Sequence, residues 1–321
     1  MDSVQQREVV CRMYAEGDEY GIVKLFNNCF DRKMTLEEWM WKYRGQGNRR
    51  VYAVVLEDRE EGIVGHYGGV PLRMIRDGHE IKGVGAGDTM IHPQFRSFVR
   101  LKNMYHLFME ELLKDSVIMF YGFPPKNVAR LTIDRLRIYE RVETVYDAVK
   151  DARFNKGRVR LLYRLFPMRV DDARVDELWH DVKDEFGLAI IRDRAYFTWR
   201  YKENPLFAYE AWGLVKRWSK KLAALAIVKR EQSGRLLVTD LVFHGSALSP
   251  LIKKVENLAT STGMAKLSLW LPQRFHNLLR EKGFSLSDSG ATLPRSAHPL
   301  TIKKEEIQAK FFYTMGDTDF I

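Results

Sequence analysis

Three side chains that could carry acid–base chemistry lie in one stretch of the sequence, Gly85 to Pro124. Asp88 could remove a proton from an amine or bind an ammonium group, and it could equally close a turn. The imidazole of His92 titrates near neutral pH, so it could act as a base, or it could simply flank a loop. Tyr121 could reach into a neighbouring cleft or pack in the core.

The elements predicted around these residues also form an anion site. The pattern predicts a strand over Gly85–His92, a basic loop over Pro93–Lys102, a helix over Asn103–Lys114 and a strand over Val117–Phe123. Backbone N–H groups and the positive end of the helix dipole then point toward a bound anion. This arrangement suits a cofactor that carries phosphate groups.

The order of landmarks in the first half of the chain recurs in the second half. The segment Trp41–Tyr43 matches Trp199–Tyr201, and Asp88 matches Asp240, each time on equivalent predicted elements. One matching pair could be a coincidence, but several in the same order indicate a duplicated unit. Aromatic residues that recur at equivalent places are more typical of a core than of a binding surface.

The composition is that of a globular protein with enough apolar material for two cores, because 45% of its 321 residues are hydrophobic and 29% are charged. We expect one domain over 1–157 and a second over 158–321. The net charge of +10 favours anionic partners, with nucleic acid possible but not favoured.

The location and the metal content are predicted from what the sequence lacks. No membrane span or export signal is found, and Cys11 and Cys29 are expected as reduced thiols, so we expect a cytoplasmic protein. No metal-ligand spacing, P-loop or dinucleotide-binding glycine pattern occurs, so no metal site is expected. The oligomeric state stays open.

The residues then resemble a known superfamily. The order of helices and strands, the segment Asp88–Arg96 and the segment Tyr121–Asn127 resemble the GNAT (Gcn5-related) N-acetyltransferases, and the resemblance covers essentially the whole chain. It implies an α+β fold of two tandem GNAT-like domains, each a mixed, mostly antiparallel sheet flanked by helices. In this family two central strands splay apart where acyl-CoA enters.

The resemblance also implies how acetyl-CoA would be held. The backbone of the first splayed strand, including Met90 and Ile91, would bind the pantetheine arm. The pyrophosphate loop pattern, Gln/Arg-x-x-Gly-x-Gly/Ala, falls on Gln94–Val99, where Ser97 and Val99 replace the glycines. Val99 would be a serious departure if its position required a positive φ. The residues expected to bind the cofactor are Met90, Ile91, Gln94, Phe95, Arg96, Ser97, Phe98, Val99 and Arg100.

We therefore predict an N-acyltransferase that moves an acetyl or other acyl group from acyl-CoA to a primary amine by direct attack. Asp88, His92 and Tyr121 are its predicted catalytic residues, although the tyrosine that usually serves as the acid in this family falls near Asp134. The acceptor would be a small molecule or a peptide amine. One alternative is a Fem-type aminoacyltransferase that uses charged tRNA. Another is a catalytically inactive GNAT-fold protein that binds or scaffolds a partner.

Overall fold

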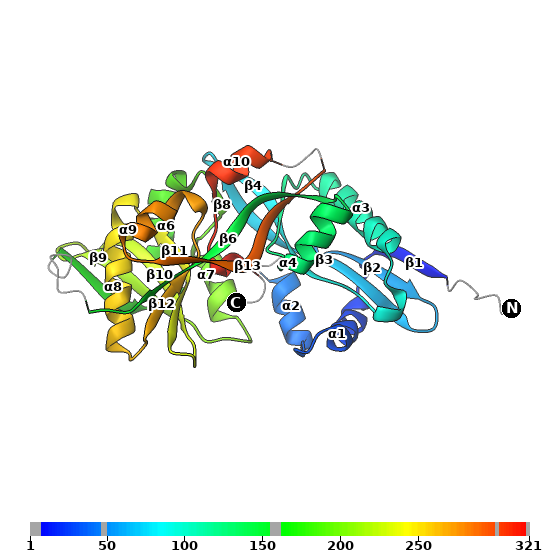
Figure 1. Ribbon diagram of the computed structural model, residues 1–321, viewed down its shortest axis with the longest axis horizontal. Coiled ribbons are helices and arrows are strands. Elements are labelled where there is room, and N and C mark those ends of the chain that lie inside the picture. The colour runs from blue at the N-terminus through cyan, green and yellow to red at the C-terminus, as the bar shows by residue number, and fades with distance from the viewer. Residues whose placement is uncertain (1–7, 46–49, 155–161, 299–301, 319–321) are drawn as a thin grey trace.

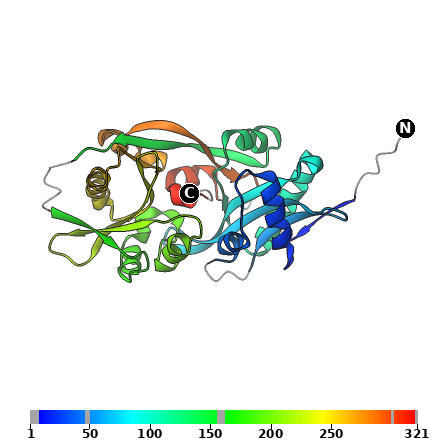
Figure 2. The ribbon, with the colours of Figure 1, turned by 90° about the horizontal axis from the view of Figure 1, so that it is seen from below.

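The computed structural model describes residues 8–45, 50–154, 162–298 and 302–318. These residues form one continuous 14-stranded sheet with helices packed on its faces (Figure 1). The molecule is elongated, and its first and second halves lie side by side (Figures 1 and 2). No helix within these ranges is long and apolar enough to cross a membrane.

The first half contains the elements expected around the stretch from Gly85 to Pro124. Its strands are β1 (Val9–Met13), β2 (Tyr52–Asp58), β3 (Gly62–Arg76), β4 (His79–Ile91), β5 (Met119–Tyr121) and β6 (Tyr139–Asp151). Its helices are α1 (Asp18–Cys29), α2 (Leu36–Arg44), the 3-10 turn η1 (Pro93–Phe95), α3 (Phe98–Lys114), α4 (Lys126–Ala129) and the π-helix η2 (Arg130–Arg135).

The second half repeats most of this order. Its strands are β7 (Tyr163–Met168), β8 (Leu188–Ile190), β9 (Glu210–Lys216), β10 (Leu222–Arg230), β11 (Arg235–Phe243), β12 (Lys266–Leu269), β13 (Ser285–Ser296) and β14 (Phe311–Phe312). Its α-helices are α6 (Arg174–Phe186), α7 (Arg194–Phe197), α8 (Leu248–Ser261), α9 (His276–Glu281) and α10 (Lys304–Lys310). Short helical turns are η3 (Thr198–Lys202), η4 (Gly245–Ala247), η5 (Gln273–Phe275) and η6 (Met315–Asp317).

Strand β2 shows how the alternating sequence places two helical layers. Val54 and Leu56 are buried in the cluster beneath α3, whereas Ala53 and Val55 are buried in the cluster beneath α1 and α2. Successive side chains of a strand point to opposite faces, so a strand with apolar residues at every position must be covered on both sides. The sheet of the first half is therefore a middle layer.

One predicted boundary was wrong. Helix α3 begins at Phe98 and not at Asn103, so the second half of the predicted loop is helical. Ser97 is extended, with φ −152°, and its carbonyl accepts the first helical hydrogen bond from the N–H of Leu101 at 3.0 Å. The exposed side chains of Phe98 and Val99 hid this first turn, because they break the amphipathic pattern from which the helix was predicted.

The two halves exchange a strand. β6 of the first half pairs with β12 of the second half, and β13 of the second half pairs with β5 of the first half. β6 and β13 also pair with each other, and both run across the middle of the molecule (Figures 1 and 2). The domain boundary predicted between residues 157 and 158 lies outside the described residues, so that boundary stays a prediction.

The two halves meet at a reciprocal pair of tryptophans. The indole N–H of Trp41 donates to the carbonyl of Trp199, and the indole N–H of Trp199 donates to the carbonyl of Trp41, both at 2.8 Å. The two rings stack with their centroids 5.7 Å apart. Matching residues that contact each other in this reciprocal way are what an approximate twofold axis between duplicated units produces.

Candidate functional site

The strands β4 and β5 diverge in the first half. They pair in parallel over only three residues, Gly83–Gly85 against Met119–Tyr121, and β4 then continues to Ile91. Within the described parts of the chain, no other strand pairs with this edge of β4 beyond Gly85. The N–H of His92 donates to Val64 on the opposite side at 2.8 Å. The polar groups of the preceding residue, Ile91, therefore face the open edge.

Asp88 forms a bulge in β4 immediately after the divergence. It has a positive φ of 50°, and together with Thr89 it opposes a single residue, Tyr67, on β3. Its carboxylate accepts hydrogen bonds from the ammonium of Lys42 and the hydroxyl of Tyr43, each at 2.8 Å. Burial alone would raise the pKa of Asp88, but the charge and hydrogen bond of Lys42 outweigh it and lower the pKa. A carboxylate held in this way is a weak base near neutral pH.

The N-terminus of α3 is open to an anion. The N–H groups of Phe98, Val99 and Arg100 precede the first hydrogen bond of the helix, the side chain of Ser97 does not cap them, and the first turn contains no acidic residue. Val99 lies inside this turn and is not among the residues with positive φ. The replacement of the loop glycines therefore produces no backbone strain here.

Two arginines surround this helix N-terminus. Arg96 donates from Nε to the carbonyl of Ile91 at 3.1 Å, which ties the loop to the end of β4. Arg100 donates to the carbonyl of Phe95 at 2.9 Å. Each of these bonds uses one of the five N–H groups of a guanidinium, so both side chains can also donate to a bound phosphate.

The turn that precedes α8 in the second half holds a carboxylate. His244 and Gly245 follow β11 as His92 and Pro93 follow β4, and the N–H of Gly245 donates to Oε2 of Glu185 at 2.7 Å. The imidazole Nδ1 of His244 lies 3.4 Å from the same side chain. Glu185 on α6 therefore binds the turn that precedes α8, whereas the first turn of α8, like that of α3, contains no acidic residue.

The divergence between β11 and β12 is also filled in the second half. The parallel pairing stops at Val238 and Leu269, and the C-terminal segment Phe311–Asp317 occupies the space beyond. The hydroxyl of Thr314 donates to Asp240 at 3.2 Å. A Cβ atom at Gly316 would collide with the hydroxyl of Tyr201, so the segment packs with no room to spare.

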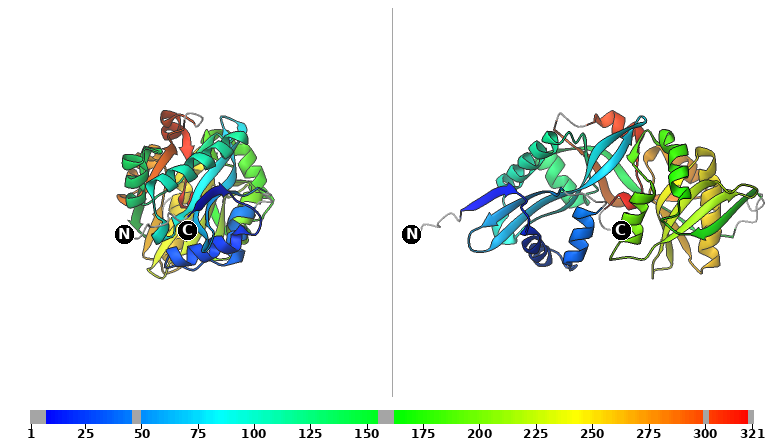
Figure 3. Two further views of the ribbon diagram at one scale, coloured as in Figure 1. Left: turned by 90° about the vertical axis from the view of Figure 1, so that its right-hand side faces the viewer. Right: turned by 180° about the vertical axis from the view of Figure 1, so that it is seen from behind.

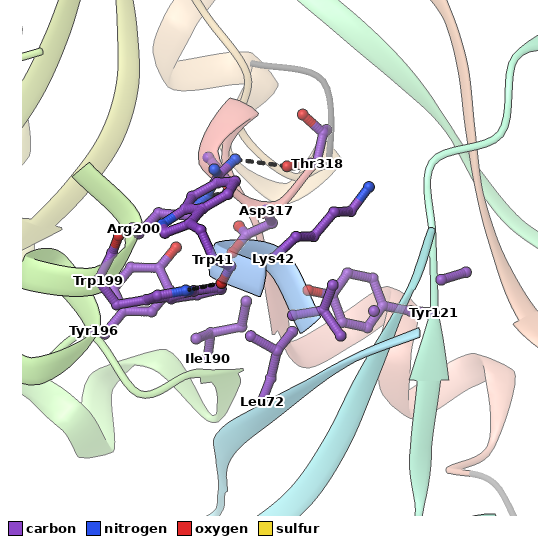
Figure 4. Close-up of a pocket in the computed structure, with 14 residues that line it drawn as sticks. Trp41, Lys42, Leu72, Tyr121, Ile190, Tyr196, Trp199, Arg200, Asp317 and Thr318 are labelled. Atoms are coloured by element: carbon purple, nitrogen blue, oxygen red, sulfur yellow. Dashed lines mark hydrogen bonds between the residues drawn. The ribbon is translucent and has the colours of Figure 1, made fainter. Parts of the chain in front are cut away.

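A small cavity, the central cavity, lies between the halves at the point where β4 and β5 diverge (Figure 4). Its volume is about 50 Å³, and its walls combine residues of both halves. The first half contributes Gly85, Ala86 and Tyr121 from the divergence. The remaining lining residues are Trp41, Lys42, Val70, Leu72, Ile190, Tyr196, Trp199, Arg200, Gly316, Asp317 and Thr318.

Asp317 is the acidic residue of this cavity, and it was not predicted. Its side chain is fully buried, and Oδ2 accepts hydrogen bonds from Arg192 and from the N–H of Thr314, both at 2.6 Å. Burial raises the pKa of Asp317 to about 6, against the opposing effect of Arg192 and with a further increase from Asp240. Because Asp317 has no counterpart in the repeat, the sequence contained no signal that pointed to it.

The predicted catalytic residues are not brought together around one cavity. Tyr121 lines the central cavity, and Asp88 lies behind Lys42, which lines it. His92 instead borders a separate hollow beside Phe95, with the two rings 5.9 Å apart. The roles of Asp88, His92 and Tyr121 stay predictions.

The predicted cofactor residues follow the open edge and the helix N-terminus. Met90 and Ile91 are buried in the core, so only their backbone can serve a ligand. Gln94, Arg96, Phe98 and Val99 are exposed on the surface. These residues are contiguous in the structure, but their contacts with a cofactor stay predictions.

No protein-family model matches the chain, and no curated protein matches its sequence. Solved structures do match its fold. A probable N-acyltransferase of Enterococcus faecalis V583 is 10% identical with a TM-score of 0.67, covering 90% of this chain and 72% of that one. A GCN5-related N-acetyltransferase of Kribbella flavida is 14% identical with a TM-score of 0.64, and the match covers 92% of this chain and 71% of that one.

A third similar structure carries an acyl-CoA. The N-myristoyltransferase of Saccharomyces cerevisiae, solved with bound myristoyl-CoA, is 13% identical with a TM-score of 0.58, covering 92% of this chain and 80% of that one. At such low identities the likeness shows the fold alone. The chain therefore has a GNAT-like fold, and the predicted α+β class with two tandem GNAT-like units is confirmed.

Proposed function

We propose that the chain is an N-acyltransferase, which moves an acyl group, with acetyl the simplest case, from acyl-CoA to a primary amine by direct attack. One observation carries this proposal: the open edge of β4 leads into a helix N-terminus with two arginines beside it and no acidic residue in its first turn, whereas the segment Phe311–Asp317 fills the corresponding divergence in the second half. Helix N-termini of this kind bind phosphate groups.

The acyl-CoA would lie along the first half. Its pyrophosphate would accept hydrogen bonds from the N–H groups of Phe98–Arg100, with Arg96 and Arg100 beside them. Its pantetheine arm would follow the backbone of Met90 and Ile91 toward the point where β4 and β5 part. When bound there, acyl-CoA supplies the thioester carbonyl that the amine attacks, close to Tyr121 on the cavity wall. The predicted role of Tyr121 is to protonate the departing thiolate.

Calorimetry with CoA and acetyl-CoA tests the proposal. We expect Arg96→Glu to weaken binding roughly tenfold or more, because it replaces a donor to phosphate by a like charge. Lys114→Glu is the matched control, since it makes the same charge change at the other end of α3. It should leave binding nearly unchanged.

Two results would overturn the proposal. The first is no binding of either ligand at millimolar concentration, and the second is an equal effect of both variants. Affinity for RNA that falls steeply with salt, without affinity for CoA, would instead favour the aminoacyltransferase alternative.

A further inference from the structure

The hairpin that joins β9 to β10 carries a tryptophan at its tip, which comprises residues 217–221. Trp218 is 82% exposed, the largest exposed fraction of any large apolar side chain in the described ranges. Leu162, which precedes β7 beside the tip, is 51% exposed. A single exposed apolar side chain is ordinary, so the surroundings of Trp218 decide whether it marks a contact site.

The backbone of the tip is fixed by hydrogen bonds. The N–H of Ser219 donates to the carbonyl of Lys216 at 2.9 Å, which closes a turn around Trp218. The N–H of Arg217 donates to the carbonyl of Leu162, also at 2.9 Å, which ties the tip to the start of β7. Trp218 therefore lies at the apex of a defined turn, and Leu162 lies beside it.

The turns of three other hairpins in the same sheet are polar. Residues 59–61 join β2 to β3, residues 77–78 join β3 to β4, and residues 231–234 join β10 to β11. Glycine, aspartate and serine suit such turns, because they adopt left-handed torsions or bond to the neighbouring backbone. A tryptophan gives a turn neither advantage, so turn geometry does not explain Trp218.

The tip is also strongly basic. Four exposed cations lie on it or at the strand end beside it: Lys216, Arg217, Lys220 and Lys221. Lys221 lies 3.8 Å from the carboxylate of Asp181 on α6, and an exposed pair of this kind contributes little to stability. The other three cations form no ion pair with any carboxylate that the structure describes. Trp218 is therefore surrounded by positive charge that the protein itself leaves largely unneutralised.

The tip lies at one end of the elongated molecule. β9 ends at the end of the long axis that is opposite to β1 (Figures 1 and 3). A hairpin apex in this position can touch a flat surface before the rest of the chain meets it. The N-terminus of α3, where acyl-CoA is proposed to bind, belongs to the other half, so the tip is no part of that site.

An anionic lipid surface matches both properties of the tip. Indole rings accumulate at the boundary between acyl chains and headgroups, where the ring contacts apolar chains and the N–H contacts water. Each lysine or arginine near such a surface strengthens attachment to anionic lipids roughly fivefold. Leu162 adds an aliphatic side chain that can enter the acyl region beside Trp218.

A nucleic acid matches the tip less well. Single strands are bound in basic grooves, in which several aromatic rings stack on successive bases. The tip is instead a convex turn that exposes one indole, and its apolar neighbour Leu162 has no aromatic face. A lipid surface uses both apolar side chains, whereas a base uses only Trp218.

We propose that the hairpin tip binds the protein to anionic membrane surfaces. Trp218 and Leu162 enter the boundary between headgroups and acyl chains, and the four cations bind the anionic groups of the lipids. This inference goes beyond the proposed function and does not depend on it, because the two sites lie in different halves of the molecule.

Sedimentation with lipid vesicles tests the inference on the full chain. We expect wild type to bind phosphatidylcholine vesicles that contain phosphatidylserine roughly tenfold or more tightly than pure phosphatidylcholine vesicles, and salt to weaken this binding. Lys220→Glu should weaken it roughly tenfold or more, because it reverses one of the four charges. Trp218→Ser should weaken it roughly fivefold or more, because it removes the ring from the interface.

Two matched controls lie in the first half. Tyr20→Ser on α1 removes another exposed aromatic ring, and Lys114→Glu on α3 makes the same charge change at another exposed lysine. Both variants should bind the vesicles like wild type. Equal losses in the controls and in the tip variants would overturn the inference, because they would indicate attraction by the net charge alone.

Vesicles with brominated acyl chains test the depth of Trp218, since bromine quenches the fluorescence of indoles that contact the chains. We expect stronger quenching in wild type than in Trp218→Phe, which keeps an apolar ring but lacks that indole. Equal quenching, or equal binding to vesicles with and without phosphatidylserine, would contradict the inference. Binding of single-stranded RNA through Trp218 and Lys220 without binding of vesicles would also overturn it and assign the tip to nucleic acid.

Discussion

The two halves of this protein contain the same arrangement of strand, loop and helix, and they differ in what occupies it. In the first half the edge of β4 is open and the first turn of α3 has no acidic residue. In the second half Glu185 accepts from the loop N–H and the segment Phe311–Asp317 fills the divergence. The second half therefore fills with its own C-terminal segment a space that stays open in the first half.

A buried charge network holds the filled half together. Arg192 bonds to both Asp240 and Asp317, and all three side chains are fully buried. In the open half, Asp88 has Lys42 and Tyr43 as donors. The two halves therefore differ in how many buried charges depend on one cation: Arg192 pairs with two carboxylates, and Lys42 pairs with Asp88.

The largest expected effect comes from breaking this network. Arg192→Met should lower the free energy of unfolding by about 3–5 kcal/mol, because two buried carboxylates lose their counter-ion. Lys42→Met, which removes the cation bonded to Asp88 in the first half, should cost only about 1–3 kcal/mol, because Asp88 keeps the hydroxyl of Tyr43. Urea unfolding of both variants measures the difference. Equal losses would contradict the contrast between the halves.

The pH dependence of stability separates the two carboxylates. The pKa of Asp317 is about 6 in the folded chain and 3.8 in the unfolded chain. The folded state therefore keeps the proton of this carboxyl up to a higher pH than the unfolded state does. Its contribution to the free energy of unfolding should therefore fall as the pH rises from about 4 to 6, by up to roughly 2–3 kcal/mol. Asp317→Asn should remove this fall, as urea unfolding at several pH values would show.

Asp88 should behave in the opposite way. Its pKa is lowered in the folded chain, so its contribution is present above the unfolded value of 3.8 and is lost as the pH falls below it. The two effects occupy different pH ranges. A variant Asp317→Asn whose profile matches that of wild type between pH 4 and 6 would show that Asp317 does not titrate as described.

A carboxylate at the start of α3 would make the first half resemble the second. Ser97→Asp should stabilise the helix by about 0.5–1 kcal/mol, because it caps the free N–H groups and complements the dipole. The same change should weaken CoA binding roughly tenfold, because it places a negative charge where the pyrophosphate is proposed. Thermal unfolding and calorimetry measure these opposite outcomes. Ser97→Asn is the control that caps without charge, and it should affect CoA binding less.

The smallest expected effects on stability come from the pair of tryptophans, Trp41 and Trp199, at which the two halves meet. Trp41→Phe and Trp199→Phe each remove one of the two reciprocal hydrogen bonds, and each should cost about 1–2 kcal/mol. Because the two residues are related by the approximate twofold axis, their losses should agree closely. If the two losses in free energy of unfolding differ by more than about 1 kcal/mol, the two tryptophans do not contribute equally to stability despite their matching contacts. Denaturant unfolding is sufficient for this comparison.

Much of the secondary structure could be predicted because it depends on residues that are close together in the sequence. α1 begins at Asp18 and buries Ile22, Leu25 and Phe26, which have the spacing of one helix face, and Thr35 caps α2 by accepting the N–H of Glu38 at 3.1 Å. α8 buries one face that includes Leu251 and Val255, again four residues apart. These features depend on residues three or four positions apart, so a single sequence contains them.

The sequence by itself determined most of the elements, their duplicated order and the turn where we propose that an anion binds, since periodicity, caps and matching landmarks are local properties. The exchange of β6 and β13, the insertion of Phe311–Asp317 into the second half and the pairing of Glu185 with Gly245 were decided by the tertiary structure alone. Each joins residues far apart in the chain, where no spacing rule applies. The central cavity belongs to this second group, because Tyr121 and Asp317 meet only when both halves have folded together.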